Sequence, residues 1–139
     1  MLSLGMDIGT STVKLVLLWD GAMAKQWIAV HHGRPFACLK KGLSALELDA
    51  DTPFSLCVTG SNTEALLEQD SAIPSLGDIP AIVEGVRQIV PQAGSVIEIG
   101  SQGARFITDL QSRAPQFAVN EHCAGGTGSF FEDQDRKST

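Results

Sequence analysis

The stretch Met6-Asp7-Ile8-Gly9-Thr10-Ser11-Thr12-Val13-Lys14 decides the fold expected for this chain. The apolar run that leads into it, Leu2 to Met6, predicts a buried strand, and the apolar run Val13 to Trp19 predicts a second one. Glycine and hydroxyl residues fill the turn between the two runs. The stretch therefore predicts a β-hairpin whose tip presents backbone N–H groups and hydroxyls.

This hairpin tip is a candidate cradle for phosphate oxygens. Consecutive backbone N–H groups form a concavity that binds anions. Asp7, at the edge of the tip, can hold hydrated Mg²⁺, because that ion prefers one or two carboxylates together with waters and phosphates. An ordinary surface hairpin rich in small polar residues explains the same stretch equally well. The stretch alone leaves both interpretations open.

The composition indicates a globular chain without a surface for nucleic acid. Of 139 residues, 43% are hydrophobic and 19% are charged, which suits a folded domain. The net charge of −6 argues against nucleic acid as a partner, because such surfaces are usually basic. No apolar run reaches the roughly 18 residues of a membrane span. Neither a membrane partner nor a signal peptide is expected, since Asp7 interrupts the first apolar run.

The chain holds three cysteines, Cys38, Cys57 and Cys123. This odd, sparse set suits a reducing cytoplasm better than a disulfide scaffold, so we expect a cytoplasmic protein. Cys57 lies within a predicted strand and is expected to be buried and inert. Cys38 is expected to pack in the interior or to lie at the surface. The adjacent His31 and His32 are expected at the surface or at a strand end rather than on a metal.

The order of the predicted elements indicates an α/β layer structure, a mixed sheet with helices on its faces. The elements expected after the hairpin are a strand (24–30), a helix (35–46), a strand (54–60), a short helix (63–69) that Ser61 or Asn62 can cap, a candidate short strand (72–73), a helix (78–90) and three strands (95–99, 104–108, 116–119).

The pattern of the opening recurs after the last helix. Residues 97–107 repeat residues 4–14: an apolar strand with an acidic residue, a turn at Gly100-Ser101-Gln102-Gly103, and a second apolar strand. Two such turns, each at the head of a series of strands, favour a two-lobed phosphate clamp. We expect a first lobe at 1–92 and the beginning of a second lobe at 93–139.

A third notable stretch runs from Glu121 to Phe131 and includes Cys123-Ala124-Gly125-Gly126-Thr127-Gly128. It leads into a segment that can begin a helix. A cysteine beside a helix N-terminus has its thiolate favoured by the helix dipole, which makes Cys123 the most chemically interesting of the three thiols. A loop cysteine without a role is the alternative.

Together these stretches resemble the activator ATPases of 2-hydroxyacyl-CoA dehydratases and benzoyl-CoA reductases, the BadF/BadG/BcrA/BcrD-type family. The matching segments are Asp7 to Lys14 (first phosphate loop), Val58-Thr59-Gly60-Ser61 (end of the fourth strand), Ile97 to Gln102 (second phosphate loop) and Asn120 to Gly128 (the family's Asn-Asp-Lys-Cys-Ala-Ala-Gly-Thr-Gly segment). The family belongs to the actin, hexokinase and Hsp70-like superfamily. The resemblance implies an actin-like (ribonuclease H-like) lobe with helices on both faces of a mixed sheet, plus the start of a second similar lobe.

The resemblance also implies roles for individual residues. Asp7 and Glu98 would be the catalytic carboxylates, and Asp7 would bind Mg²⁺. Cys123 would ligate a 4Fe–4S cluster shared between the two subunits of a homodimer, each of which supplies two cysteines. The residues implied to contact ATP are Asp7, Gly9, Thr10, Ser11, Thr12, Lys14, Gly100, Ser101 and Gln102.

The activity that the resemblance implies is that of an activase, an iron–sulfur protein that binds and hydrolyses ATP. Such a protein receives an electron from ferredoxin or flavodoxin. It passes the electron to a 2-hydroxyacyl-CoA dehydratase or a related reductase after ATP has opened the dimer angle. Two alternatives stay open: a kinase of the same superfamily in which Cys123 is incidental, and a non-catalytic fragment that binds no nucleotide.

The chain departs from the family pattern in its second lobe. Glu98, Ser101 and Gly103 stand where the family usually has aspartate, glycine and aspartate. The family's second cluster cysteine and its adenosine-binding loop lie beyond the position of Thr139, and neither Cys38 nor Cys57 matches that cysteine. We therefore expect an incomplete portion of an activator, with a truncated second lobe.

Overall fold

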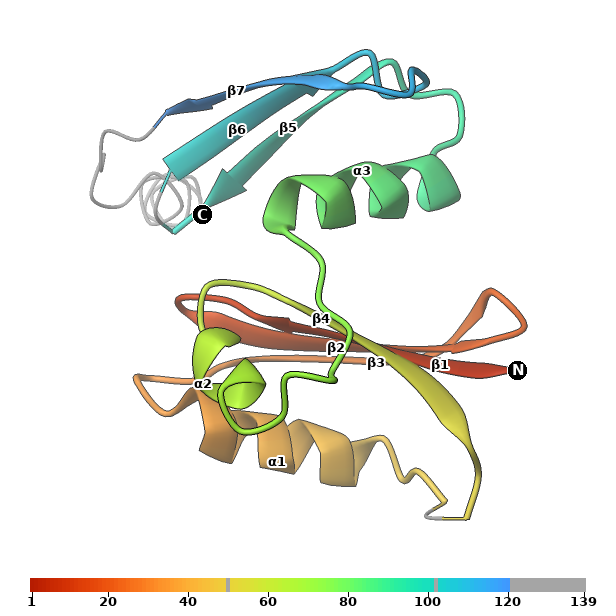
Figure 1. Cartoon of the computed structure of the whole chain (residues 1–139), viewed down its shortest axis with the longest axis vertical. Helices are drawn as coiled ribbons and strands as arrows, with labels where there is room; N and C mark the ends of the chain where they lie inside the picture. Colours follow the sequence, from red (N-terminus) through yellow and green to blue (C-terminus); the bar gives the residue numbers. More distant parts are fainter. Residues whose placement is uncertain (50, 102, 121–139) are drawn as a thin grey trace, which may run out of the picture. The chain divides into compact units, whose positions relative to one another are not determined.

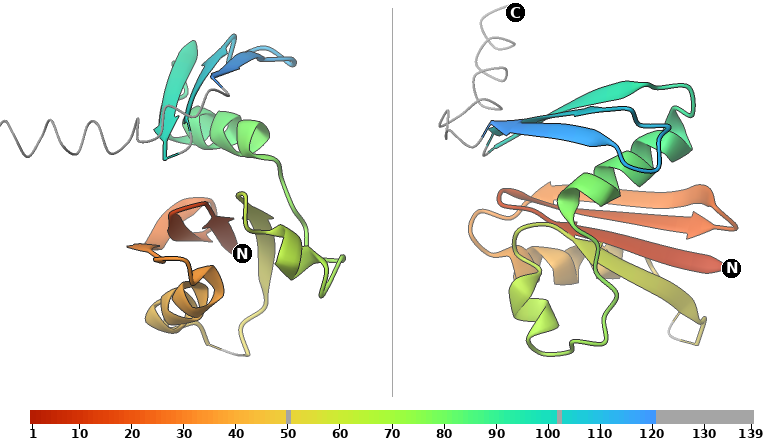
Figure 2. Two further views of the ribbon diagram at one scale, coloured as in Figure 1. Left: turned by 90° about the vertical axis from the view of Figure 1, so that its left-hand side faces the viewer. Right: turned by 45° about the horizontal axis from the view of Figure 1, so that its top comes forward.

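A computed structural model describes residues 1–49, 51–101 and 103–120. The chain divides into two compact units, one comprising Met1–Asp78 and the other beginning at Ile79. Each unit has its own sheet, as Figures 1 and 2 show. Each also has its own hydrophobic core. We describe the two units separately.

The first unit is built on a four-stranded mixed sheet with strand order β3-β2-β1-β4. Its strands are β1 (Leu2–Ile8), β2 (Thr12–Trp19), β3 (Ala22–Val30) and β4 (Phe54–Thr59). Strands β1, β2 and β3 form an antiparallel meander, and β4 lies parallel to β1. Alternate residues of β1 are buried, which is the period expected of a strand with one covered face.

Helices α1 (Pro35–Ala45) and α2 (Glu64–Leu67) pack against one face of this sheet. Figure 1 shows both helices on the same side of the strands. Pro35 begins α1, as expected from its fixed φ angle. Gly42 allows close contact, because a Cβ there would lie 2.5 Å from Trp27 Cε3 and 2.7 Å from Leu15 Cδ1. The residue that weakens α1 in isolation therefore lets the helix approach the sheet.

The orientation of the side chains of β4 contradicts the prediction made for Cys57. Val58 points into the core and Cys57 is exposed on the other face, because side chains alternate along β4. The expectation that Cys57 is buried is therefore wrong. Cys38, by contrast, lies on the buried face of α1, with its Sγ 3.9 Å from the Ala29 carbonyl oxygen.

Residues 72–73 do not form the candidate short strand, and the pairing with the sheet occurs two residues later. The segment pairs with the outer edge of β4 at Ser75, where it forms an isolated parallel bridge to Val58. The Val58 N–H donates to the Pro74 carbonyl at 2.9 Å, and the Leu76 N–H donates to the Val58 carbonyl at 2.9 Å. Proline supplies no N–H, so the contact remains a single bridge.

The second unit consists of α3 (Asp78–Ile89) and an antiparallel sheet of β5 (Ser95–Gly100), β6 (Gly103–Thr108) and β7 (Gln116–Asn120). Its core comprises Val83 of α3, Ile107 of β6 and Leu110, with Ile79, Ile82, Val86, Ala93 and Val96 packed around them. Helix α3 thus packs with the second sheet, whereas the predicted lobe boundary lies after residue 92. None of the described helices is long and apolar enough to cross a membrane.

Arg87 links α3 to the segment that follows β6 through hydrogen bonds. Its Nε donates to the Leu110 carbonyl and its Nη2 to the Ser112 carbonyl, each at 2.6 Å. Its Nη1 lies 2.6 Å from Glu84 Oε1 on the same helix. One guanidinium therefore forms an ion pair within α3 and also binds the loop that follows β6.

Candidate functional site

The tip of the β1–β2 hairpin consists of Gly9, Thr10 and Ser11, since β1 ends at Ile8 and β2 begins at Thr12. The Gly9 N–H closes the turn by donating to the Thr12 carbonyl at 2.9 Å. Among the described residues, no hydrogen bond engages the N–H groups of Thr10 and Ser11, and both residues are exposed. Two successive backbone donors are therefore available to an anion.

A second loop, Gly60 to Asn62, meets this tip. Strands β1 and β4 are parallel, with Asp7 opposite Thr59, so both strands end at the same edge of the sheet. The Thr10 and Ser61 hydroxyl oxygens lie 2.9 Å apart. The Asn62 N–H donates to the Ile8 carbonyl at 2.9 Å. The two loops together form one polar edge.

Gly60 must be glycine at this edge. Its φ angle is +103°, a conformation that residues with a Cβ rarely adopt. A Cβ there would lie 2.6 Å from Asp7 Oδ1 and 2.6 Å from the Ile8 carbonyl oxygen. The backbone after β4 therefore lies directly against the Asp7 carboxylate.

Asp7 forms an ion pair with Lys14 across the hairpin. Lys14 Nζ lies 2.7 Å from Asp7 Oδ2, and the two residues are direct partners in the β1–β2 register. The side chains of Asp7 and Lys14 are 31% and 51% exposed, so both charges can be reached by a ligand. The hairpin thus brings the predicted site residues Asp7, Gly9, Thr10, Ser11, Thr12 and Lys14 together.

The donor set at this tip fits Mg²⁺ with a phosphate better than Mg²⁺ in a cage of protein ligands. Among the described residues, no group of three or more His, Cys, Asp or Glu side chains is placed to hold a metal ion. Magnesium usually keeps several waters and needs one or two carboxylates plus phosphate oxygens. The half-exposed Asp7 supplies one carboxylate beside the available N–H groups of the tip.

The β5–β6 hairpin repeats the arrangement of the first hairpin. Arg105 Nη1 lies 2.7 Å from Glu98 Oε2, and the two residues are direct partners in the register. In each hairpin the carboxylate forms an ion pair with a cationic side chain seven residues later in the chain. Gly100 follows Glu98 as Gly9 follows Asp7, and a Cβ on Gly100 would lie 2.9 Å from Glu98 Oε1. Ser101 lies in this second turn, whereas the predicted contacts Gln102 and Cys123 lie outside the described residues.

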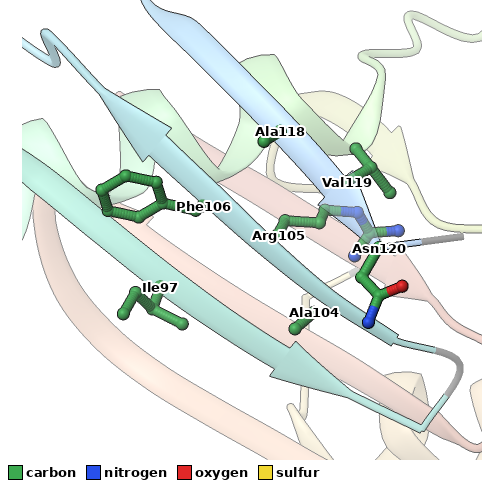
Figure 3. A pocket seen from close by; sticks show the side chains of 7 residues that line it. All are labelled: Ile97, Ala104, Arg105, Phe106, Ala118, Val119 and Asn120. Carbon is green, nitrogen blue, oxygen red and sulfur yellow. The ribbon is translucent and has the colours of Figure 1, made fainter. Parts of the chain in front are cut away.

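A shallow hollow lies elsewhere on the β5–β7 sheet, and Figure 3 shows the side chains that line it. Ile97 and Phe106 lie at one end of it, and Arg105 and Asn120 lie at the other. The lining residues are Ile97, Ala104, Arg105, Phe106, Ala118, Val119 and Asn120. Among the described residues, none of those predicted from the sequence to bind a ligand lines this hollow.

Sequence reasoning missed the contribution of His31 to the hairpin tip. His31 follows the end of β3, as expected, but it is buried, with 8% exposure. Its Nε2 lies 3.1 Å from the Gly9 carbonyl oxygen. Of the two positions expected for it, the surface or a strand end, His31 occupies the strand end. No periodic signal could reveal this contact, because the two turns meet only after the sheet has formed.

Ser61 or Asn62 was expected to cap the short helix α2, and in the structure neither does. Thr63 occupies the cap position, and no side-chain hydrogen bond caps the helix. Asn62 Nδ2 instead donates to the Gly9 carbonyl oxygen at 2.6 Å. Thr63 Oγ1 donates to the Gly60 carbonyl at 2.8 Å.

The sequence of this chain is similar to those of curated dehydratase activators. It is 31% identical over 137 residues to the activator of lactoyl-CoA dehydratase from Anaerotignum propionicum, covering 95% of this chain and 52% of that protein. It is 30% identical over 137 residues to the 2-hydroxyisocaproyl-CoA dehydratase activator from Clostridioides difficile, covering 95% and 50%. The chain spans about half the length of the curated relatives it matches. No family model matches it.

Solved structures of related proteins confirm the predicted fold class. The activator of the 2-hydroxyisocaproyl-CoA dehydratase from Clostridium difficile, solved with bound ADPNP, matches with a TM-score of 0.78 and 25% identity over 99% of this chain and 52% of that one. Component A of the (R)-2-hydroxyglutaryl-CoA dehydratase from Acidaminococcus fermentans has the same fold, with a TM-score of 0.77 and 23% identity over 95% and 52%. The first unit is a lobe of the actin-like ATPase fold.

Proposed function

We propose that this chain, which is homologous to the N-terminal half of the BadF/BadG/BcrA/BcrD-type activator ATPases, binds the phosphate groups of a nucleotide with its β1–β2 hairpin. The observation that carries the proposal is the geometry of the tip. The N–H groups of Thr10 and Ser11 have no partner among the described residues, and the charged side chains of Asp7 and Lys14 lie beside them. A relative with this fold was solved with bound ADPNP.

Each residue of the hairpin has a chemical role in this proposal. The N–H groups of Thr10 and Ser11 donate to phosphate oxygens, and the hydroxyls of Thr10, Ser11 and Thr12 add further donors. Lys14 offers an ammonium group to the same oxygens. Asp7 would hold Mg²⁺ through its waters, and the ion would neutralise phosphate charge and polarise the phosphoryl group.

The β5–β6 hairpin is proposed as a second phosphate-binding turn. Its support is the arrangement it shares with the first hairpin, a cross-strand pair of carboxylate and base followed by a glycine turn. Glu98 takes the place of Asp7, and Gly100 and Ser101 take the places of Gly9 and Thr10. Gln102 joins the proposal from the sequence alone.

For the whole protein we propose an ATP-dependent activator of a 2-hydroxyacyl-CoA dehydratase or a related reductase. The support comes from relatives named as activators of lactoyl-CoA and 2-hydroxyisocaproyl-CoA dehydratases. The proposal includes a 4Fe–4S cluster on Cys123, shared between the subunits of a homodimer, that receives an electron from ferredoxin or flavodoxin. Cysteine thiolates are the usual ligands of such clusters.

Isothermal titration calorimetry with Mg²⁺ and ADPNP tests the nucleotide site on this chain. We expect saturable binding to the wild type and at least a tenfold loss of affinity in Asp7→Asn, because the carboxylate charge is removed. Asp51→Asn is the matched control, since Asp51 is also exposed and lies in a different loop. A wild type that gives no heat at millimolar nucleotide would contradict the proposal and favour the non-catalytic fragment.

The iron–sulfur part of the proposal has its own test. Anaerobic reconstitution with iron and sulfide, on a chain that contains Cys123, should give the broad visible absorbance of an iron–sulfur cluster. The Cys123→Ala variant should lose it, while Cys57→Ala should keep it. A protein extended to the full length of the relatives that binds nucleotide without iron would instead favour a kinase of the same superfamily.

A further inference from the structure

We propose that His31 and Asn62 are positioning residues that hold the phosphate hairpin in its binding shape through the Gly9 carbonyl. The inference rests on the proposed function of the hairpin. Neither side chain faces the ligand in this proposal. Both act on the backbone that carries the ligand-binding N–H groups.

The hydrogen bonds of the His31 ring define a single tautomer. The Gly33 N–H donates to His31 Nδ1 at 3.1 Å, so Nδ1 must be unprotonated. Nε2 lies 3.1 Å from the Gly9 carbonyl oxygen, which can only accept, so Nε2 must carry the proton. A neutral imidazole therefore connects the turn after β3 to the tip of the β1–β2 hairpin.

A tight turn after β3 sets this ring in place. The Arg34 N–H donates to the His31 carbonyl at 2.9 Å, and both central residues, His32 and Gly33, have positive φ angles, 47° and 78°. Positive φ at both positions is the mark of a type I′ turn. The turn directs the Gly33 N–H toward the ring of His31. The backbone N–H of His31 also donates to the Ser11 carbonyl at 3.0 Å, so residue 31 contacts both ends of the tip.

Asn62 binds the same carbonyl from the other loop. Its Nδ2 lies 2.6 Å from the Gly9 carbonyl oxygen, and its backbone N–H holds the adjacent Ile8 carbonyl at 2.9 Å. A carbonyl oxygen has two lone pairs. His31 and Asn62 therefore satisfy the full acceptor capacity of Gly9 from two separate turns.

Fixing this carbonyl also fixes a ligand-binding donor. The Gly9 C=O and the Thr10 N–H belong to one planar trans peptide group, in which they point in opposite directions. When two side chains hold the carbonyl, the Thr10 N–H must point away from them, toward the position proposed for phosphate. Such preorganisation strengthens binding because the hairpin loses less conformational freedom when the ligand binds.

Two substitutions of His31 separate this role from packing alone. In His31→Gln the amide nitrogen stands where Nε2 stood, so a donor to Gly9 is retained. In His31→Asn the amide reaches only the position of Nδ1, so Gly33 keeps an acceptor and Gly9 loses its donor. His32→Asn is the control, because His32 is exposed and asparagine tolerates its positive φ.

Calorimetry with Mg²⁺ and ADPNP on the whole chain gives the first readout. We expect His31→Asn to bind roughly fivefold more weakly, the worth of about one hydrogen bond, and His31→Gln to stay within about twofold of wild type. Asn62→Ala should weaken binding by a similar factor, and His32→Asn should change nothing. Equal affinity for His31→Asn and wild type would overturn the proposal, as would an equal loss in His31→Gln and His31→Asn.

Nuclear magnetic resonance of the nucleotide-free chain gives a second, independent readout. The ring nitrogens of His31 should show the tautomer protonated at Nε2, and the Thr10 amide should become mobile in His31→Asn but not in His31→Gln. A wild type that binds no nucleotide removes the proposed function, and the amide signals then decide the positioning role alone. A rigid, unshifted Thr10 amide in His31→Asn contradicts it.

Discussion

The Nε2 atom of His31 and the carbonyl oxygen of Gly9 lie 3.1 Å apart, so a residue that follows the third strand fixes the turn that follows the first. Asn62 reaches the same oxygen from the loop after β4, at 2.6 Å. Three turns at one edge of the sheet therefore act as a single structural element. The proposed phosphate site depends on all three, although only the first carries the recognisable motif.

Gly60→Ala should destabilise the first unit. The substitution places a Cβ 2.6 Å from Asp7 Oδ1 and from the Ile8 carbonyl, at a φ of +103°. We expect a loss of at least about 2 kcal/mol in the free energy of unfolding, measured by urea titration with tryptophan fluorescence. Gly21→Ala is the control, since φ is +81° there and no atom lies within 4 Å of the new Cβ. An equal loss in both variants would mean that φ strain alone, and not the contact with Asp7, requires glycine.

Two helical glycines should respond with opposite signs to substitution by alanine. Gly42→Ala places a Cβ 2.5 Å from Trp27 Cε3, so we expect a loss of about 1–3 kcal/mol despite the better helix propensity of alanine. Gly85→Ala in α3 meets no atom within 4 Å and should gain about 0.5–1 kcal/mol. Urea titrations followed by far-ultraviolet circular dichroism check both. A stabilised Gly42→Ala would show that α1 does not pack closely on β3.

The two cysteines of the first unit should react with thiol reagents at different rates. Cys57 is exposed on the face of the sheet opposite α1, whereas Cys38 lies on the buried face of α1. Alkylation under native conditions, followed by peptide mass spectrometry, should label Cys57 well before Cys38. The Cys57→Ser variant should lose this fast phase. Equal rates at the two positions would contradict the observed orientation of β4.

Arg87→Ala should destabilise the second unit. The guanidinium donates to the Leu110 and Ser112 carbonyls, each at 2.6 Å, and no other side chain is placed to replace it among the described contacts. We expect a loss of about 1–3 kcal/mol, because hydrogen bonds from charged donors are stronger than neutral ones. Arg113→Ala, at an exposed position, should change stability by less than about 0.5 kcal/mol. Thermal unfolding of the two variants measures the difference.

The hydrophobic pattern was sufficient to predict most of the elements. The alternation in β1 and the proline at the start of α1 are local signals, and both elements lie where they were expected. The polar turn between β1 and β2 could be recognised because its residues are contiguous. The same holds for the turn between β5 and β6.

Contacts between distant turns could not be predicted in this way. His31, Asn62 and Gly9 are separated along the chain. His31 reaches Gly9 because β3 pairs with β2, and Asn62 reaches it because β4 pairs with β1 in parallel. The exposure of Cys57 likewise depends on which face of the sheet α1 covers, and a strand by itself does not specify its covered face. The close packing at Gly42 could not be predicted for the same reason, since the Trp27 ring that it accommodates comes from another element.

The most direct test of the phosphate hairpin is a titration of the ¹⁵N-labelled chain with Mg²⁺ and ADPNP, followed by two-dimensional amide spectra. We expect the amide signals of Thr10 and Ser11 to shift most and to saturate together, and Asp7→Asn to weaken the response. Unchanged signals for Thr10 and Ser11 at saturating nucleotide, or shifts confined to other parts of the chain, would contradict the proposed phosphate site.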